Sequence, residues 1–273
     1  MKTIIVPTDF SSTSVNAAYY AVDLARRVDA DVMLLHVVPL PITVSEVPMP
    51  PDTYVFSIEE ANRSLKELRE KLEIYCNYKL CISYKASTGS FLGEIEGINR
   101  QRNIFALIMS SSRAGATEAF FLGSFCLAAA KHLNHPLVII PPGCSFKGIY
   151  KIGLACDMRN VSETVPFQNI KRIFDHFDAK LEVLYVSKQT EKMYPQVLAE
   201  TKDVQNSLAA LHPEIRITTN EDIGEGLQGF VQKSDIDLLI LVPKEGSFVD
   251  SLFHRSLTKQ MVLHPKMPIM ILH

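Results

Sequence analysis

Two stretches of the chain align with each other without a gap, at a constant offset of 132 residues. Residues 107–140 contain an apolar run, a polar loop, a Gly-Ser pair, an amphipathic segment and a second apolar run, and residues 239–272 largely repeat this order. At this offset Gly123 aligns with Arg255, Ser124 with Ser256, and Pro136 with Pro268. The starts of the halves also correspond, because Asp9 and Asp157 both follow apolar runs. We therefore interpret the chain as a tandem duplication.

Short apolar runs alternate with longer amphipathic segments in both halves, as in parallel sheets that are buried on both faces. The predicted strands are 3–6, 32–37, 81–85, 104–109 and 137–140, then 152–155, 181–186, 215–218, 238–241 and 269–272. The predicted helices are 12–28, 59–75 and 91–99, then 164–176, 194–211, 224–233 and 253–263. The fold class is thus α/β, with two tandem doubly wound domains, each a five-stranded, mostly parallel sheet flanked by helices.

The linker is predicted at residues 141–145, because a Pro-Pro-Gly run continues neither a strand nor a helix. The domains are therefore expected at residues 1–142 and 147–273, and the total of 273 residues suits two domains. A net charge of −2 gives no basic surface for nucleic acid. No apolar run approaches the roughly 18 residues of a membrane span, and no signal peptide is evident, so we expect a cytoplasmic protein.

The cysteines and histidines show no metal or disulfide pattern. The five cysteines are odd in number and lack paired CxxC spacing, so we interpret them as buried, reduced thiols. His132 and His135 lie three residues apart at the end of a predicted helix, but no third ligand is evident. We expect no metal site.

Three features together carry a family resemblance. They are the strand that ends in Pro7-Thr8-Asp9-Phe10-Ser11, the strand that ends in LLHVV at 34–38, and LGS at 122–124 before a helix that closes with His-Pro. The chain resembles the universal stress protein family, in its tandem form. The resemblance implies a non-catalytic stress-response protein that senses an adenine nucleotide. It also implies that strands 137–140 and 269–272 pair in an internal pseudo-dimer, and a homodimer of whole chains is a further expectation.

Asp9 stands just beyond the carboxyl end of the first predicted strand, where open α/β sheets bind ligands. Its carboxylate suits a ribose or a base, but satisfying the loop or capping the following helix is an equal alternative. The ligand residues that the resemblance implies are Pro7, Thr8, Asp9, Val37, Ser110, Arg113, Gly123 and Ser124.

The phosphate loop departs from the family pattern of Gly, two residues, Gly, nine residues, then Gly with Ser or Thr. The corresponding residues are Ser110, Arg113, Gly123 and Ser124, so only the last pair matches. The Arg113 side chain would leave little space for a triphosphate held closely by the loop backbone. Serine and arginine side chains, however, also bind anions. ATP, AMP, a smaller phosphate and no ligand all stay open.

The second half departs further, with Val242, Glu245, Arg255 and Ser256 at these positions, so we interpret it as a degenerate, structural domain. Its GxGxxG match at residues 224–229 follows the third strand of the half and comes directly after Glu221 and Asp222, which would repel pyrophosphate. We do not expect a dinucleotide site there.

Residues 39–53 contain five prolines and are predicted to be irregular, as a lid, a docking segment or a plain connection. Two further functions stay open beside nucleotide sensing. One is a protein-interaction module in which neither half binds a nucleotide any longer and residues 39–53 bind a partner protein. The other is a slow nucleotide hydrolase, but no general base, metal cluster or GxSxG motif supports it, so we expect no enzyme.

Overall fold

The computed structural model of the protein describes residues 1–38, 51–111, 126, 128–187, 195–242 and 265–273. The chain divides into two compact units, Met1–Phe146 and Lys147–His273, and each unit is described by itself. Several sequence predictions concern residues outside these ranges. They are the site residues Arg113, Gly123 and Ser124, the positions Glu245, Arg255 and Ser256, the helix 253–263 and most of the proline-rich segment.

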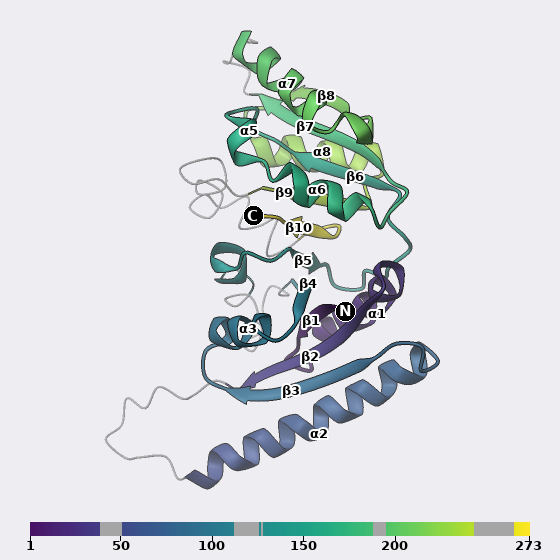
Figure 1. Ribbon diagram of the computed structural model, residues 1–273, viewed down its shortest axis with the longest axis vertical. Coiled ribbons are helices and arrows are strands. Elements are labelled where there is room, and N and C mark those ends of the chain that lie inside the picture. The colour runs from purple at the N-terminus through teal and green to yellow at the C-terminus, as the bar shows by residue number, and fades with distance from the viewer. Residues whose placement is uncertain (39–50, 112–125, 127, 188–194, 243–264) are drawn as a thin grey trace, which may run out of the picture. The chain divides into compact units, whose positions relative to one another are not determined.

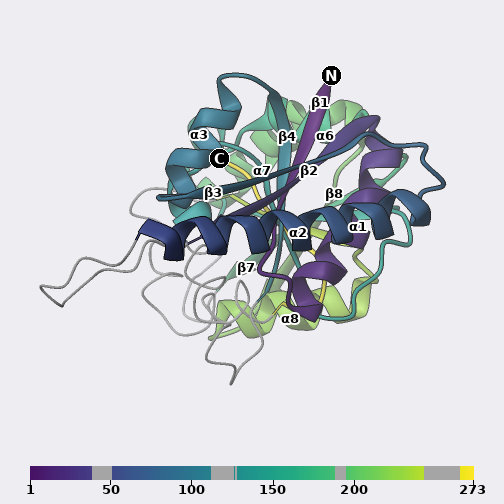
Figure 2. The ribbon, with the colours of Figure 1, turned by 90° about the horizontal axis from the view of Figure 1, so that it is seen from below.

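Unit 1 is a five-stranded parallel sheet with the strand order β3-β2-β1-β4-β5 (Figure 1). Its strands are β1 (Lys2–Pro7), β2 (Ala30–Val38), β3 (Ile82–Thr88), β4 (Asn103–Ser110) and β5 (Leu137–Ile140). Its helices include α1 (Ser12–Val28), α2 (Pro51–Tyr75) and α3 (Phe91–Asn99). Figure 2 shows α1 and α2 on one face of this sheet and α3 on the other. The α/β prediction for this half is confirmed.

The proline-rich segment ends earlier than the sequence suggested. We predicted an irregular chain through residue 53 and a helix from residue 59, but α2 begins at Pro51. Proline is well tolerated in the first turn of a helix, because its missing N–H would have no intrahelical partner there and its φ suits the helix. Counting prolines therefore overestimated the length of the irregular segment.

Unit 2 repeats the architecture, with the parallel strand order β10-β9-β6-β7-β8. Its strands are β6 (Lys151–Ala155), β7 (Lys180–Ser187), β8 (Glu214–Thr219), β9 (Leu238–Leu241) and β10 (Ile269–Ile271). Its helices include α5 (Val161–Thr164), α6 (Phe167–Phe174), α7 (Pro195–Ser207), the 3-10 turn η1 (Ala209–Leu211) and α8 (Ile223–Ser234). In Figure 1, α6 lies in front of this sheet and α8 behind it.

The first helical segment of unit 2 is broken where we predicted one helix over 164–176. Val165 adopts an extended conformation, and Pro166 precedes α6. The residue before a proline is pushed out of the helical region by the proline ring, which explains the break between α5 and α6.

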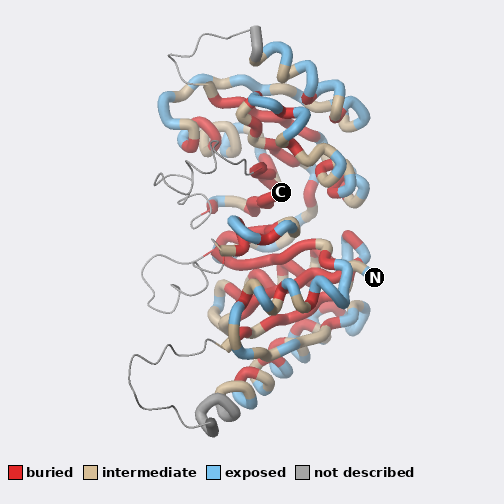
Figure 3. Tube along the Cα trace, turned by 60° about the vertical axis from the view of Figure 1, so that its left-hand side comes forward, coloured by how far each residue is buried: buried red, intermediate tan, exposed pale blue. Residues whose placement is uncertain are grey.

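The core of each unit lies in its central strands, which Figure 3 shows mostly in red, whereas the edge strands β3 and β8 are largely intermediate or exposed. In unit 1, Ile4, Leu34 and Leu107 are fully buried, and in unit 2 Ile152 and Ile240 are fully buried. Burial on both faces of the sheet is the physical reason why these strands are continuous apolar runs.

Asp237 lies at the entry to β9 and is partly buried. Its Oδ2 accepts hydrogen bonds from the backbone N–H groups of Tyr150 and Lys151, at 2.8 and 2.9 Å. The carboxylate thereby fastens the start of β6 to the start of β9.

Candidate functional site

The strand order of unit 1 reverses at β1, which has β2 on one side and β4 on the other. Ligands of open α/β sheets bind at this switch point, beyond the carboxyl ends of the strands. The pairing of β1 with β4 runs to Ile5 and Leu107, and Thr8 and Ser110 each come three residues later, at the carboxyl ends of these two strands. The switch point is therefore lined by Thr8, Asp9 and Ser110.

The other predicted residues of unit 1 lie close to this edge. Pro7 ends β1 in register with Leu35, and Val37 lies near the end of β2, where it pairs with Ser87 and is 8% exposed. The structure thus brings five of the eight predicted residues to the carboxyl ends of β1, β2 and β4, while the remaining three lie outside the described residues.

The turn between β1 and α1 is held by Asp9. Its Oδ1 accepts hydrogen bonds from the backbone N–H of Ser11 at 3.1 Å and from the Ser11 hydroxyl at 2.6 Å. Ser11 in turn caps α1, because its Oγ accepts from the N–H of Ser14. Asp9 therefore satisfies the loop, one of the roles that the sequence left open, and these hydrogen bonds use only one of its two carboxylate oxygens.

Two serine hydroxyls at the end of β4 have no hydrogen-bond partner among the described residues. Ser110 and Ser111 are each 1% exposed, and the Oγ atoms of both are buried and unsatisfied. A buried hydroxyl without a partner costs about 1–3 kcal/mol. The neighbouring Thr8 hydroxyl, by contrast, lies 3.0 Å from the Ser14 hydroxyl. The end of β4 thus presents unused donors at the switch point.

An aromatic pair also borders the turn, and the sequence analysis did not select it. The Phe10 and His36 rings stack with centroids 4.8 Å apart and an interplanar angle of 28°. His36 Nδ1 lies 2.7 Å from the carbonyl oxygen of Thr8. Phe10 has a φ of 64°, in the left-handed region that a bulky residue rarely adopts. One signal was available in the sequence: His36 is a titratable residue inside an otherwise apolar strand.

The equivalent turn of unit 2 keeps the same backbone. The N–H of Cys156 donates to Leu184 at 3.0 Å, as the N–H of Thr8 donates to Leu35 at 2.9 Å. Asp157 Oδ1 accepts from the N–H two residues later at 3.2 Å. Met158, the counterpart of Phe10, has a φ of 49°. The shared turn shows that the aspartate at this position shapes the loop in both units.

Helix α7 covers the turn of unit 2. Glu200 accepts hydrogen bonds from the backbone N–H groups of Asn160 and Val161, at 3.0 and 2.9 Å. Thr201 Oγ1 lies 4.0 Å from the Met158 sulfur, and Met158 is only 1% exposed. A carboxylate of the chain therefore occupies backbone donors beside this turn, which agrees with a structural second half.

The GxGxxG match lies inside α8 and serves packing. Asp222 caps this helix, with Oδ1 accepting from Gly224 and Glu225. A Cβ atom on Gly226 would lie 2.6 Å from a methyl carbon of Val186, so the glycine permits close contact between α8 and β7. An acidic cap at the helix N-terminus and a glycine used for packing do not make a dinucleotide site.

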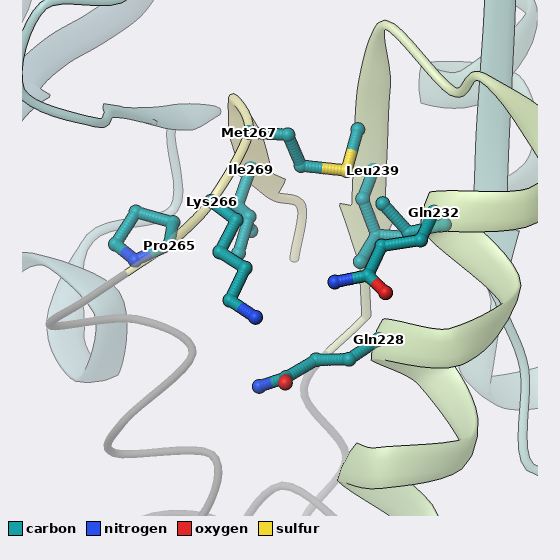
Figure 4. Close-up of a pocket in the computed structure, with 8 residues that line it drawn as sticks. Gln228, Gln232, Leu239, Pro265, Lys266, Met267 and Ile269 are labelled. Carbon is teal, nitrogen blue, oxygen red and sulfur yellow. The ribbon is translucent and has the colours of Figure 1, made fainter.

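An open pocket in unit 2 is lined by α8, β9 and the segment that leads into β10 (Figure 4). Its lining residues are Gln228, Val231, Gln232, Leu239, Pro265, Lys266, Met267 and Ile269. Residues 243–264, which connect β9 to this segment, lie outside the described residues. None of the predicted site residues lines the pocket, and we assign no ligand to it.

The described residues contain no group of three or more metal-ligating side chains, and none of their helices is long and apolar enough to cross a membrane. None of the five cysteines, all of which the structure describes, forms a disulfide. Cys76, Cys126 and Cys156 are buried as expected, but Cys81 is exposed. Burial raises the pKa of the Cys126 thiol to about 12, so this thiol is inert at neutral pH.

The arrangement in unit 1 therefore provides a carboxylate and two hydroxyl donors at the switch point of a parallel sheet. A carboxylate accepts hydrogen bonds from hydroxyl or amino groups, and hydroxyls donate to an anion. These groups are chemically suited to a polar ligand.

Comparisons with known proteins agree with this description. The sequence model of the universal stress protein family matches residues 1–141. A universal stress protein of Methanocaldococcus jannaschii is 25% identical over 142 residues, which cover 51% of this chain and 81% of that protein. The chain belongs to the universal stress protein family.

Solved structures extend the likeness to both units. A universal stress protein from Archaeoglobus fulgidus has a TM-score of 0.71 at 16% identity, covering 99% of this chain and 95% of that chain. A functionally unknown protein from Pseudomonas aeruginosa has a TM-score of 0.55 at 12% identity, covering 99% and 92%. At these identities the similarity shows the fold, and it confirms the tandem α/β prediction.

Proposed function

We propose that the protein is a non-catalytic, cytoplasmic stress-response protein that binds one adenine nucleotide, ATP or AMP, in unit 1. The observation that carries the proposal is the pair of buried, unsatisfied hydroxyls of Ser110 and Ser111 at the end of β4, beside Thr8 and Asp9. A native protein keeps such groups where a ligand or another polar group satisfies them. Family membership and the position at the switch point support the same site.

The difference between the units supports one site per chain. Asp9 and Phe10 are partly exposed in unit 1, whereas Met158 is buried and α7 supplies Glu200 to the turn in unit 2. Unit 2 also has Val242 where unit 1 has Ser110, so its β9 ends without that hydroxyl. The proposal therefore assigns ligand binding to unit 1 and a structural role to unit 2.

The experiment substitutes Ser110→Ala and Ser111→Ala and measures both thermal stability and nucleotide binding. In the ligand-free protein each variant is expected to be as stable as the wild type or more stable, because an unsatisfied buried hydroxyl disappears. Each variant should bind nucleotide about tenfold more weakly, since a hydrogen bond to an anion is lost. The ligands are ATP, AMP and cAMP, the last because a universal stress protein has been solved in complex with it.

Two results would contradict the proposal. Variants that bind nucleotide as tightly as the wild type would show that these hydroxyls do not contact it. A clear loss of stability in the ligand-free variants would show that the hydroxyls already have partners. Absence of nucleotide both from the purified protein and from the titrations would favour the alternative function, a protein-interaction module without a nucleotide.

A further inference from the structure

His36 lies on β2, next to the turn that carries Asp9, and makes two contacts with that turn. Its Nδ1 is 2.7 Å from the Thr8 carbonyl oxygen, and its ring stacks on Phe10. A carbonyl oxygen only accepts hydrogen bonds. The proton of the neutral imidazole is therefore on Nδ1, which donates a hydrogen bond to the Thr8 carbonyl oxygen. The contact fixes the tautomer of the neutral ring, with the lone pair on Nε2.

Phe10 needs such support because its backbone is in the left-handed region, with a φ of 64°. This conformation costs a non-glycine residue about 1–2 kcal/mol. Two groups counteract the cost: the Thr8 hydroxyl accepts from the Phe10 N–H at 3.1 Å, and the His36 ring stacks on the side chain. The Asp9 carboxylate accepts from Ser11, the residue after Phe10, so the conformation of Phe10 brings these two partners together.

We propose that His36 is a positioning residue of the unit 1 site. Its Nδ1–H holds the Thr8 carbonyl and its ring holds Phe10, so that Asp9 is kept in its ligand-binding position before the ligand arrives. The inference rests on the proposed function for its ligand, but the two contacts can be tested in the ligand-free protein. Preorganisation of this kind raises affinity by removing the cost of ordering the turn on binding.

The duplication supplies a natural control. The same backbone register places Tyr185 of unit 2 at the position of His36, because Leu184 there matches Leu35. The fold therefore accepts an aromatic ring without an imidazole at this position. The variant His36→Tyr is expected to fold, which separates a loss of positioning from a loss of structure.

The experiment uses the full chain and three variants. His36→Asn keeps a donor near Nδ1 but loses the ring, His36→Phe keeps the stacked ring but loses the donor, and His36→Tyr is the control for folding. Nitrogen-15 NMR of the ligand-free wild type is expected to show His36 protonated on Nδ1 when neutral. In all three variants the amide protons of Phe10 and Ser11 should exchange about tenfold faster, while the melting temperature shifts by only a few degrees.

Nucleotide binding is the second measurement. Each variant is expected to bind ATP or AMP about tenfold more weakly than the wild type, with unchanged stoichiometry. Protonation on Nε2, or unchanged exchange at Phe10 and Ser11, would overturn the positioning role. Unchanged affinity in variants whose turn does exchange faster would also overturn it. If the wild type binds no nucleotide, the proposed function fails, and the NMR and exchange results still decide what His36 holds.

Discussion

The clearest stability prediction concerns Glu200, which joins α7 to the turn before α5. Substitution of Glu200 by alanine removes the acceptor of two backbone N–H groups, at 3.0 and 2.9 Å. Val161 is fully buried, so water does not easily replace the lost partner of its N–H, whereas Asn160 is exposed. A buried N–H left unsatisfied costs about 2 kcal/mol and an exposed one about 0.5 kcal/mol, so we expect a loss of about 2–3 kcal/mol.

Differential scanning calorimetry of the full chain measures this effect. For a unit of this size, 2–3 kcal/mol corresponds to a fall of roughly 5–10 °C in the melting temperature of the transition that contains unit 2. Glu200→Gln keeps one acceptor oxygen and should show about half the fall. Asp203→Asn, an exposed change on the same helix, is the matched control and should stay within about 0.5 kcal/mol of the wild type.

A melting temperature of Glu200→Ala within about 1 °C of the wild type, measured against the same control, would refute this reasoning. It would mean that the carboxylate does not hold the turn in solution. Nucleotide binding by unit 1 should be unchanged in all three variants, because Glu200 belongs to unit 2.

The remaining predictions concern thiols and pH. A thiol reagent added to the native protein should label exposed Cys81 first and the half-buried Cys144 next, and the three buried cysteines only on unfolding. Mass spectrometry of tryptic peptides reports the order of labelling. Early labelling of Cys126 would contradict the prediction. Burial lowers the pKa of His135, so the unfolded state binds its proton more readily and stability should fall as the pH drops below about 6.5. The variant His135→Asn should lose less stability between pH 7 and pH 5 in thermal melts, and an unchanged pH dependence would rule the effect out. The Tyr75 hydroxyl donates to Asp23 at 2.8 Å, and this bond raises the tyrosine pKa, so its contribution is present below about pH 10 and lost above it. Spectrophotometric titration should show a tyrosine that ionises at lower pH in Asp23→Asn than in the wild type, and identical titration curves would contradict the prediction.

The sequence predicted the central strands well because parallel strands buried on both faces are continuous apolar runs, whereas the edge strands β3 and β8 are more polar and followed from the alternation of elements. The duplication added a second, independent copy of the pattern, and the strand order of the two units is the same. Helix boundaries near prolines were less predictable. Pro51 begins α2 and Pro166 precedes α6, so the same residue type marks a helix start in both places, and composition alone does not distinguish a start from a break.

The candidate site was predictable where it depends on strand ends and unpredictable where it depends on tertiary contacts. Asp9 and Ser110 lie at the switch point because each follows or ends a central strand. The contact of His36 with Thr8 joins residues 28 positions apart, and that of Glu200 with Asn160 joins residues 40 positions apart. Local sequence patterns do not determine such pairs. The same holds for Asp237, whose hydrogen-bond partners precede it by 87 and 86 residues.

The central claim is that one adenine nucleotide binds in unit 1, at the turn after β1. Isothermal titration of ATP and of AMP into protein stripped of nucleotide, with and without magnesium, tests it most directly. Asp9→Asn is a sharper variant than alanine, because asparagine keeps an oxygen for the turn and loses only the charge. Asp157→Asn makes the same change in the equivalent turn of unit 2 and is the matched control.

We expect micromolar binding of one nucleotide per chain, weakened at least tenfold by Asp9→Asn and unaffected by Asp157→Asn. No binding at millimolar nucleotide would contradict it, as would two sites per chain or equal effects of the two substitutions.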